Sequence, residues 1–354
     1  MIKIQEHLSV ANPENFLLNL AESHWDNLNP KMKDGKKYKS TSLLEICKKY
    51  YAFTVGVNYI RDYAFNNKKI ALKHRSFFKF LIKNKNENLK KLIIGRPDEL
   101  ENLKIEILKI LDSSHFYIII KNKPSLTKFG ELLLNKIFNY KKFRRDNFCK
   151  ELFLKLDFIN TTCPYCNENL LKITTIISNS TNKAKNKAYL DIDHFFSKVY
   201  YPYFAISFYN LIPSCHDCNS LDKGDKVFNL NTHIHPYLES FDDHYYFKIS
   251  LITVLGDTSD EIQIVNKNTR PSDLTILDIK LVERYQTNLE KASSLVSYFI
   301  KYKHHIGSEF EESFKEAMWS HFPKERTKIL KIERAKMNRD ILKQIDITSF
   351  LEID

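Results

Sequence analysis

The chain contains no apolar run of the roughly eighteen residues that a membrane-spanning helix needs, and only seven of its 354 residues are glycine. Its opening stretch, MIKIQEHLSVANPENF, also lacks the apolar core of a secretory signal peptide. Scarce glycine disfavours a fold of many tight hairpins and favours helices. From these absences we expect a cytoplasmic protein that has no membrane among its partners.

Positive charge is in excess, because 55 lysine and arginine residues stand against 43 aspartate and glutamate residues, a formal net charge of +12. Such a potential favours a polyanion such as nucleic acid as the partner. A compositional bias in the coding sequence is an alternative source of the excess, since the chain is also rich in asparagine and isoleucine. Hydrophobic residues make up 43% of the chain, enough for a core without disulfides.

Apolar residues recur at spacings of three and four through much of residues 1–157, which predicts a mostly helical region. A short β-branched and aromatic run, HFYIIIK at 115–121, is expected to be a strand. The predicted helix starts follow Asn12-Pro13, Ser40, Pro97 and Ser125.

Beyond the middle of the chain, HYYFKISLITVL and DEIQIV alternate as two strands of a β-hairpin around Gly256 and Asp257. Amphipathic helices are expected from 273 to 345, including the charged segment KERTKILKIERAKMNRDILKQ, and a surface loop from Ser178 to Lys187. The predicted class is therefore α+β and mostly helical. We expect three segments: a helical region at 1–157, a central module at 158–230, and a hairpin with helices at 231–354.

Four of the six cysteines form two Cys-x-x-Cys pairs, Cys163 with Cys166 and Cys215 with Cys218. This spacing lets a tight turn present two thiolates to one tetrahedral ion, so the two pairs predict a structural zinc site with no position open for water. The alternatives are four small buried apolar residues or a thioredoxin-like redox pair. His216, inside the second pair, is expected to be a spacer rather than a ligand.

Between the pairs lies LDIDHFFSK at 190–198, which alternates like a strand, and the second pair leads directly into Asn219. The oxygens of Asp193 and Asn219 suit a hard ion, so we expect a second, catalytic site for Mg²⁺ or Mn²⁺. Because adjacent strand residues face opposite ways, Asp193 and His194 can serve one phosphate only if the strand ends or twists there.

Two further residues are candidates for this second site. Asp191 shares a strand face with Asp193, and we expect it to be an outer or alternate ligand. Lys223 follows Asn219 by four residues and is either a phosphate contact or a solvated surface lysine.

Together the motifs CPYC, DIDHFFSK, YNLIPSCHDCN and KGDK resemble the HNH (ββα-metal) nucleases that carry a four-cysteine zinc site, with the match running from Cys163 to Lys226. The resemblance implies that His194 is the general base and that Asp193 and Asn219 bind the catalytic metal. It implies that Asn210 orients the histidine loop by hydrogen bonds. Because Asn219 stands where many members have a second histidine, we expect weaker metal binding.

The phrase YPYFAISFYNLIPSCHDCNSLDKGDK is also similar to the HNH subunits of anti-phage systems of the Septu and retron-associated type. Those subunits act beside an ABC-like ATPase. The resemblance implies a DNA endonuclease in antiviral defence, with an ATPase partner docked on the helical flanks. Two alternatives stay open: a non-catalytic zinc-stabilised nucleic-acid-binding module, and a nuclease toxin directed at RNA or tRNA.

Other residues are weaker candidates. His233, His235 and His244 are expected to be packing or surface residues more often than ligands. Basic stretches at 68–91 and 141–155 alternate lysine and arginine with phenylalanine, which fits either a phosphate-binding groove or amphipathic helices with phenylalanine inward.

Overall fold

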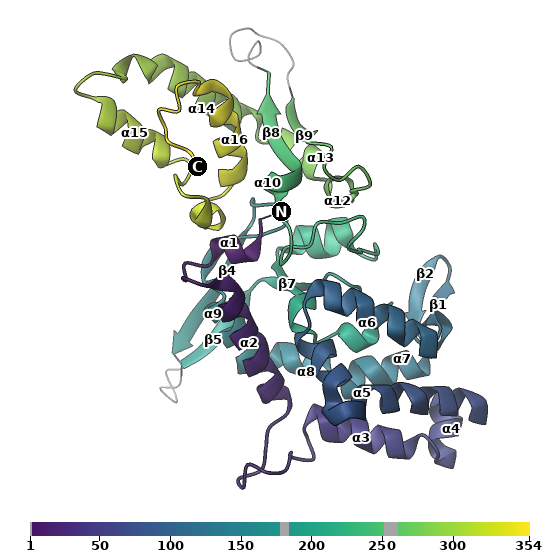
Figure 1. The fold of residues 1–354 in the computed structure, drawn as a ribbon. Coiled ribbons are helices and arrows are strands. Elements are labelled where there is room, and N and C mark those ends of the chain that lie inside the picture. The colour runs from purple at the N-terminus through teal and green to yellow at the C-terminus, as the bar shows by residue number, and fades with distance from the viewer. Residues whose placement is uncertain (1, 178–183, 251–260) are drawn as a thin grey trace.

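The computed structural model describes residues 2–177, 184–250 and 261–354, and Figure 1 shows their arrangement. Helices dominate, and the strands of the described residues form small antiparallel sheets of two or three strands. The predicted α+β, mostly helical class is confirmed. One cluster of buried apolar side chains draws on all three predicted segments, and a smaller cluster lies among the C-terminal helices. Within the described residues, no helix has the length and apolar character to span a membrane.

Several helices of the N-terminal segment start where a side chain caps them. Asn12 accepts from the backbone N–H of Asn15 at 2.9 Å ahead of α2, and α6 begins at Pro97, so both predicted starts are confirmed. The next start lies two residues beyond Ser40, where Ser42 caps α3. The helices here are α1 (Ile4–His7), α2 (Pro13–Leu28), α3 (Leu43–Phe53), α4 (Val57–Tyr63), α5 (Lys68–Ile94) and α6 (Pro97–Ile110).

The run at 115–121 does contain a strand, β1 (Tyr117–Ile120), which pairs with β2 (Lys123–Leu126). The helix predicted after Ser125 also starts later than expected, because Ser125 belongs to β2 and Thr127, two residues on, caps α7. Three helices follow: α7 (Lys128–Leu132), α8 (Tyr140–Arg145) and α9 (Asn147–Lys155).

The central segment contains two sheets. Strands β3 (Asn160–Thr162), β4 (Leu170–Ile177) and β5 (Ala184–Tyr189) form the first, in that order. The loop predicted from Ser178 to Lys187 is therefore wrong at its end, since 184–187 pair with β4, while 178–183 lie outside the described residues. In the second sheet, β6 (Asp191–His194) pairs antiparallel with β7 (Leu211–Ser214), and the short helix η5 (Asp217–Lys223) follows.

The expected C-terminal hairpin is present as β8 (Tyr245–Ile249) and β9 (Ile262–Asn266), although its predicted turn at Gly256 and Asp257 lies outside the described residues. Figure 1 shows α14 to α16 at one end of the molecule and α3 to α5 at the other. The helices here are α10 (Phe241–His244), α12 (Thr275–Asp278), α13 (Leu281–Gln286), α14 (Leu289–Tyr302), α15 (Glu311–Trp319) and α16 (Ala335–Ile345).

The charged segment KERTKILKIERAKMNRDILKQ is not one helix, contrary to prediction. A short 3-10 helix, η7 (Arg326–Lys331), is separated from α16 by Arg334, whose φ is 59°. Asn167 explains the break, because its carbonyl accepts from Arg334 N–H at 2.6 Å and its amide donates to Ile332 O at 3.2 Å. Groups that would continue the helix are thus bonded to a distant turn.

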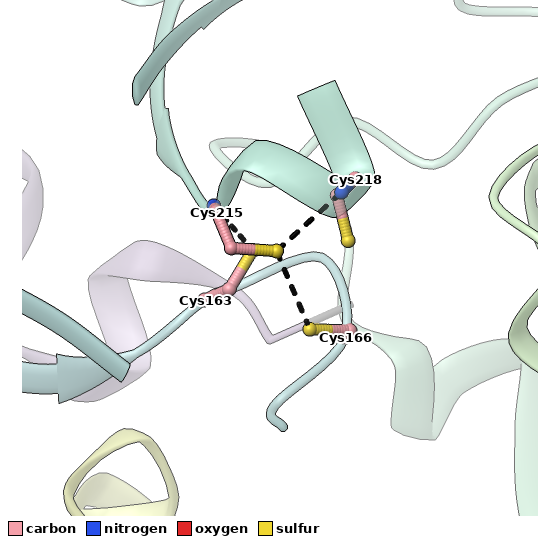
Figure 2. Close-up of side chains that lie close together, drawn as sticks. All are labelled: Cys163, Cys166, Cys215 and Cys218. Carbon is pink, nitrogen blue, oxygen red and sulfur yellow. Dashed lines mark hydrogen bonds between the residues drawn. The ribbon is translucent and has the colours of Figure 1, made fainter. Parts of the chain in front are cut away.

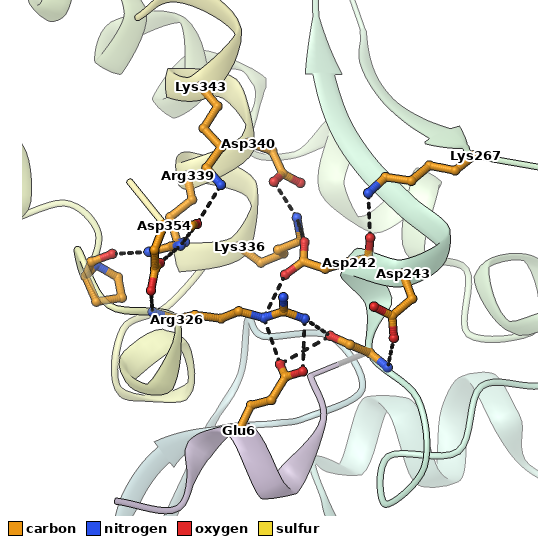
Figure 3. A network of polar contacts seen from close by, with 12 residues as sticks. Glu6, Asp242, Asp243, Lys267, Arg326, Lys336, Arg339, Asp340, Lys343 and Asp354 are labelled. Carbon is orange, nitrogen blue, oxygen red and sulfur yellow. Dashed lines mark hydrogen bonds and ion pairs between the residues drawn. The ribbon is translucent and has the colours of Figure 1, made fainter. Parts of the chain in front are cut away.

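A network of charges ties the N-terminal helix α1 to the C-terminal region, as Figure 3 shows. Arg326 donates to both carboxylate oxygens of Glu6 at 2.9 Å. Lys336 is buried and its ammonium contacts Asp242 and Asp340. Charges buried in this way need their partners, since an unpaired one costs several kcal/mol.

Replacing the central lysine tests this network. We expect Lys336→Met to lower the free energy of unfolding by about 3–5 kcal/mol, because the carboxylate of Asp340 loses its cation and that of Asp242 keeps only Arg326. Lys248→Met, at an exposed position of β8, serves as the matched control and should change stability by less than about 0.5 kcal/mol. Urea unfolding monitored by circular dichroism measures both, and equal effects would contradict the network's role.

Several histidines are buried in neutral form. Burial lowers the pKa of His24 to about 4, even though its Nε2 donates to Ile206 O at 2.8 Å. Burial likewise lowers the pKa of His74 and His235 to about 3. The unfolded chain binds protons at these residues below about pH 6.5 while the folded chain does not.

The free energy of unfolding should therefore fall as the pH drops from about 6.5 towards 4, with His24 alone contributing about 3 kcal/mol of the loss. Urea unfolding at pH 7, 6, 5 and 4.5 measures the slope. We expect His24→Asn to make the slope shallower, whereas His304→Asn, at an exposed position, leaves it unchanged. A slope that is the same in all three proteins would refute the assignment.

Candidate metal centre and histidine site

Four buried thiols, two from the turn after β3 and two from the segment after β7, lie close together, as Figure 2 shows. The sulfurs of Cys163, Cys166, Cys215 and Cys218 all lie within 4.8 Å of one another, and those of Cys166 and Cys215 are 4.0 Å apart. Around a tetrahedral zinc ion with bonds of about 2.3 Å, sulfurs are separated by about 3.8 Å. The thiols therefore fit a zinc ion, and the predicted convergence of the two pairs is confirmed.

Turns and hydrogen bonds of the backbone position these sulfurs so that they face one another. The first pair lies in a turn closed by Asn167 N–H on Cys163 O at 2.7 Å. The second pair follows β7 and enters η5, where the N–H of Cys215 donates to the sulfur of Cys163 at 3.3 Å and that of Cys218 to the sulfur of Cys215 at 3.4 Å. Such donors stabilise negative charge on sulfur, which metal binding requires.

Arg284 of α13 also contacts the cluster. It donates to the sulfur of Cys218 at 3.0 Å, to Asp222 at 3.2 Å and to Glu168 at 3.1 Å. Although burial opposes it, the neighbouring thiols raise the pKa of Arg284, which keeps it charged. Four thiolates around one Zn²⁺ would carry two net negative charges, and this guanidinium would offset part of them. The sequence around Arg284 contained no signal for this role.

Asp193 is buried and its carboxylate is held by two side chains. Lys223 donates to its oxygens at 2.8 and 2.6 Å, and the hydroxyl of Tyr165 donates to one of them at 2.6 Å. Lys223 is itself only 2% exposed and also donates to His194 O at 2.5 Å, so it is not a solvated surface lysine. Burial lowers the pKa of Lys223, and Asp193 opposes this shift.

Asp191 and Asn219 meet at the more exposed end of β6. The amide of Asn219 lies 3.2 Å from an oxygen of Asp191, and Nδ1 of His216 lies 3.1 Å from the same oxygen. His216 thus contacts Asp191 and stays outside the thiol cluster, although it sits between two of its cysteines. Asn219 bonds to Asp191, whereas Asp193 bonds to Lys223 and Tyr165. The two expected metal ligands, Asp193 and Asn219, therefore do not bond to each other.

Both carboxylates nevertheless keep an oxygen lone pair. One oxygen of Asp193 accepts a single hydrogen bond, from Lys223, and keeps a lone pair. The side chain of Asp191 is 37% exposed and can be reached from solvent. The ammonium of Lys223 weakens the attraction of Asp193 for a second cation.

His194 is the last residue of β6. The strand therefore ends at the point where it has to end if Asp193 and His194 are to serve one phosphate. Its Nε2 lies 2.9 Å from Ala205 O, and because a carbonyl only accepts, this nitrogen carries the proton. Nδ1 is then the basic nitrogen of the neutral ring. Burial, reinforced by Lys198, lowers the pKa of His194 and keeps the ring neutral.

Asn210 fixes the loop that follows His194. Its side chain accepts from Phe196 N–H at 2.7 Å and donates to the carbonyls of Phe196 at 3.1 Å and Phe204 at 3.0 Å. The residue is fully buried, so these contacts are shielded from water. Tyr140 packs edge-on against His194, with ring centroids 4.4 Å apart, and adds an aromatic contact to the imidazole.

The remaining candidates serve packing. His233 bonds to Asp278 at 3.0 Å and stacks on Phe228, and His235 is buried against Phe195. Neither these nor His244 belongs to a metal-ligand cluster in the described residues. In the basic stretch at 68–91, Phe77 and Phe78 are buried in the core, which favours the amphipathic interpretation there.

Metal analysis tests the thiol cluster. We expect one zinc ion per chain. Cys218→Ser should lower the zinc content, because it removes one of the four thiolate ligands. It should also lower the melting temperature by about 10 °C, because weaker metal binding removes several kcal/mol of folding free energy. Cys149→Ala, a buried cysteine outside the cluster, is the control and should keep its zinc. Full zinc content in Cys218→Ser would rule out the site.

Comparison with known proteins gives one weak relationship. No protein-family model and no solved structure matches the chain. A stretch of 121 residues, 34% of this chain, is 27% identical to protein ea31 of Escherichia phage lambda. The chain spans only 27% of the length of that phage protein.

Proposed function

We propose that the chain is a metal-dependent endonuclease that hydrolyses phosphodiester bonds, with DNA as the favoured substrate and His194 as the general base. One observation carries the proposal: the proton of His194 is held on Nε2 by Ala205 O, which leaves Nδ1 free to accept a proton. A neutral imidazole that is oriented in this way is the usual base for activating water near neutral pH.

In the proposed reaction a water oxygen attacks phosphorus and gives its proton to Nδ1 of His194, while the bond to the leaving oxygen breaks. That oxygen takes a proton from solvent. Asp193 and Asn219, with Asp191 as outer or alternate ligand, would hold Mg²⁺ or Mn²⁺, and the ion would supply positive charge for the five-coordinate phosphorus. Asn210 and Tyr140 keep the imidazole in place.

Three features support this function. Two antiparallel strands followed by a helix, β6, β7 and η5, carry the histidine, the asparagine and the oxygen donors. The thiol cluster fits the zinc site of the nucleases that the sequence resembles. Net charge of +12 suits a nucleic-acid substrate.

A role in antiviral defence with an ABC-like ATPase partner is part of the proposal and rests on the sequence resemblance alone. Co-expression of the two proteins and assay of the complex test it. The expected result is nuclease activity that changes when the ATPase is added.

A second candidate is a non-catalytic zinc-stabilised nucleic-acid-binding module. The contact of Asp193 with Lys223 favours it, because a carboxylate that is already neutralised by a buried ammonium attracts a catalytic metal less. This candidate predicts nucleic-acid binding without cleavage.

Cleavage assays separate the candidates. We expect the protein to nick supercoiled plasmid with Mg²⁺ or Mn²⁺, and His194→Ala to lower the rate by about 10²–10⁴-fold, the usual contribution of a general base. His304→Ala, at an exposed position, is the control and should cut normally. Equal cutting by wild type and His194→Ala would exclude His194 as the base, and binding without any cutting would support the second candidate. A parallel assay with tRNA tests the RNA-directed alternative.

A further inference from the structure

Lys198 stands beside the proposed base without a charged partner. It follows His194 by four residues, in the loop that Asn210 fixes through both backbone groups of Phe196. Its ammonium lies 4.9 Å from the ring centroid of Tyr140, and that ring packs on His194 with centroids 4.4 Å apart. Lys198 and His194 therefore share one aromatic neighbour.

The environment of Lys198 is costly for an unpaired cation. The side chain is half-buried, and burial lowers the pKa of Lys198, with Asp193 and Asp191 opposing the shift from a distance. Both carboxylates are bonded elsewhere, Asp193 to Lys223 and Asp191 to Asn219. Within the described residues, Lys198 makes no ion pair or hydrogen bond of its own.

Lys223, the other lysine near His194, differs on each point. It is buried, its ammonium is saturated by Asp193 and by backbone carbonyls, and it has no donor left for a ligand. Of the two cations that lower the pKa of His194, only Lys198 keeps donors free for an anion. A half-buried ammonium with unused donors is suited to a phosphate oxygen.

We propose that Lys198 binds a non-bridging oxygen of the scissile phosphate and offsets the negative charge that builds up on it during hydrolysis. The inference rests on the proposed nuclease function and extends it, since the sequence motifs assigned Lys198 no role. The ammonium supplies charge that is fixed in place before the substrate arrives, which is how charged donors lower the barrier to phosphoryl chemistry.

Plasmid nicking with Mn²⁺ by Lys198→Met tests this role. We expect kcat to fall by about 10²-fold while KM changes less, because the contact strengthens in the transition state. Lys198→Arg should recover part of the activity. The matched control is Lys187→Met, since Lys187 also lies over a tyrosine ring, at 4.8 Å from Tyr189, but on an exposed part of β5.

A binding measurement without added divalent metal gives a second readout. The affinity for a fluorescent duplex oligonucleotide is measured at several salt concentrations. The slope of log affinity against log salt should become shallower in Lys198→Met by the amount that corresponds to about one phosphate contact, and it should stay unchanged in Lys187→Met. If wild type cuts and Lys198→Met cuts and binds like the control, the role of Lys198 is refuted and the nuclease function stands. If wild type never cuts, the nuclease function itself fails.

Discussion

Most of the structure depends on one short turn, CPYCN at 163–167, and on the convergence of its two thiols with those of the second pair. The carbonyl of Cys163 closes the turn, and each of the other four residues contacts a different part of the chain. Pro164 O accepts from the N-terminal segment, Tyr165 bonds to Asp193, Cys166 O accepts from Tyr285, and Asn167 interrupts the helix before α16. A metal ion in the thiol cluster would therefore stabilise contacts among all three segments as well as the turn itself.

The buried pair of Asp193 and Lys223 shows what this arrangement requires of the site. Two ionised groups that are less than one-tenth exposed stabilise each other only with good geometry and further hydrogen bonds, and here Tyr165 and backbone carbonyls provide them. The pair holds β6 against η5. The same ion pair lowers the affinity of Asp193 for a divalent ion. At this residue, a contact that makes β6 more rigid therefore also weakens metal binding.

Sequence reasoning succeeded where the signal was local. The Cys-x-x-Cys spacing fixed the thiol cluster, Pro97 and Asn12 marked helix starts, and alternation found β8 and β9. It failed where a distant group decides the local structure. Arg284 reaches Cys218 across 66 residues, and Asn167 breaks a helical pattern 165 residues away. The sequence did not decide the role of Lys223, because helical spacing predicts on which face of a helix a residue lies but not what packs against that face.

The charges around His194 suggest how base strength and substrate binding are coupled in the proposed reaction. Burial lowers the pKa of His194, and the charge of Lys198, which has no charged partner among the described residues, lowers it further, so the imidazole stays neutral before substrate arrives. A phosphate diester bound at Lys198 would bring one negative charge close to the ring. That charge raises the pKa of His194 and makes Nδ1 a stronger base once the phosphate to be attacked is in place. In the proposed reaction, the charge of Lys198 therefore lowers the basicity of His194 until a bound phosphate offsets that charge.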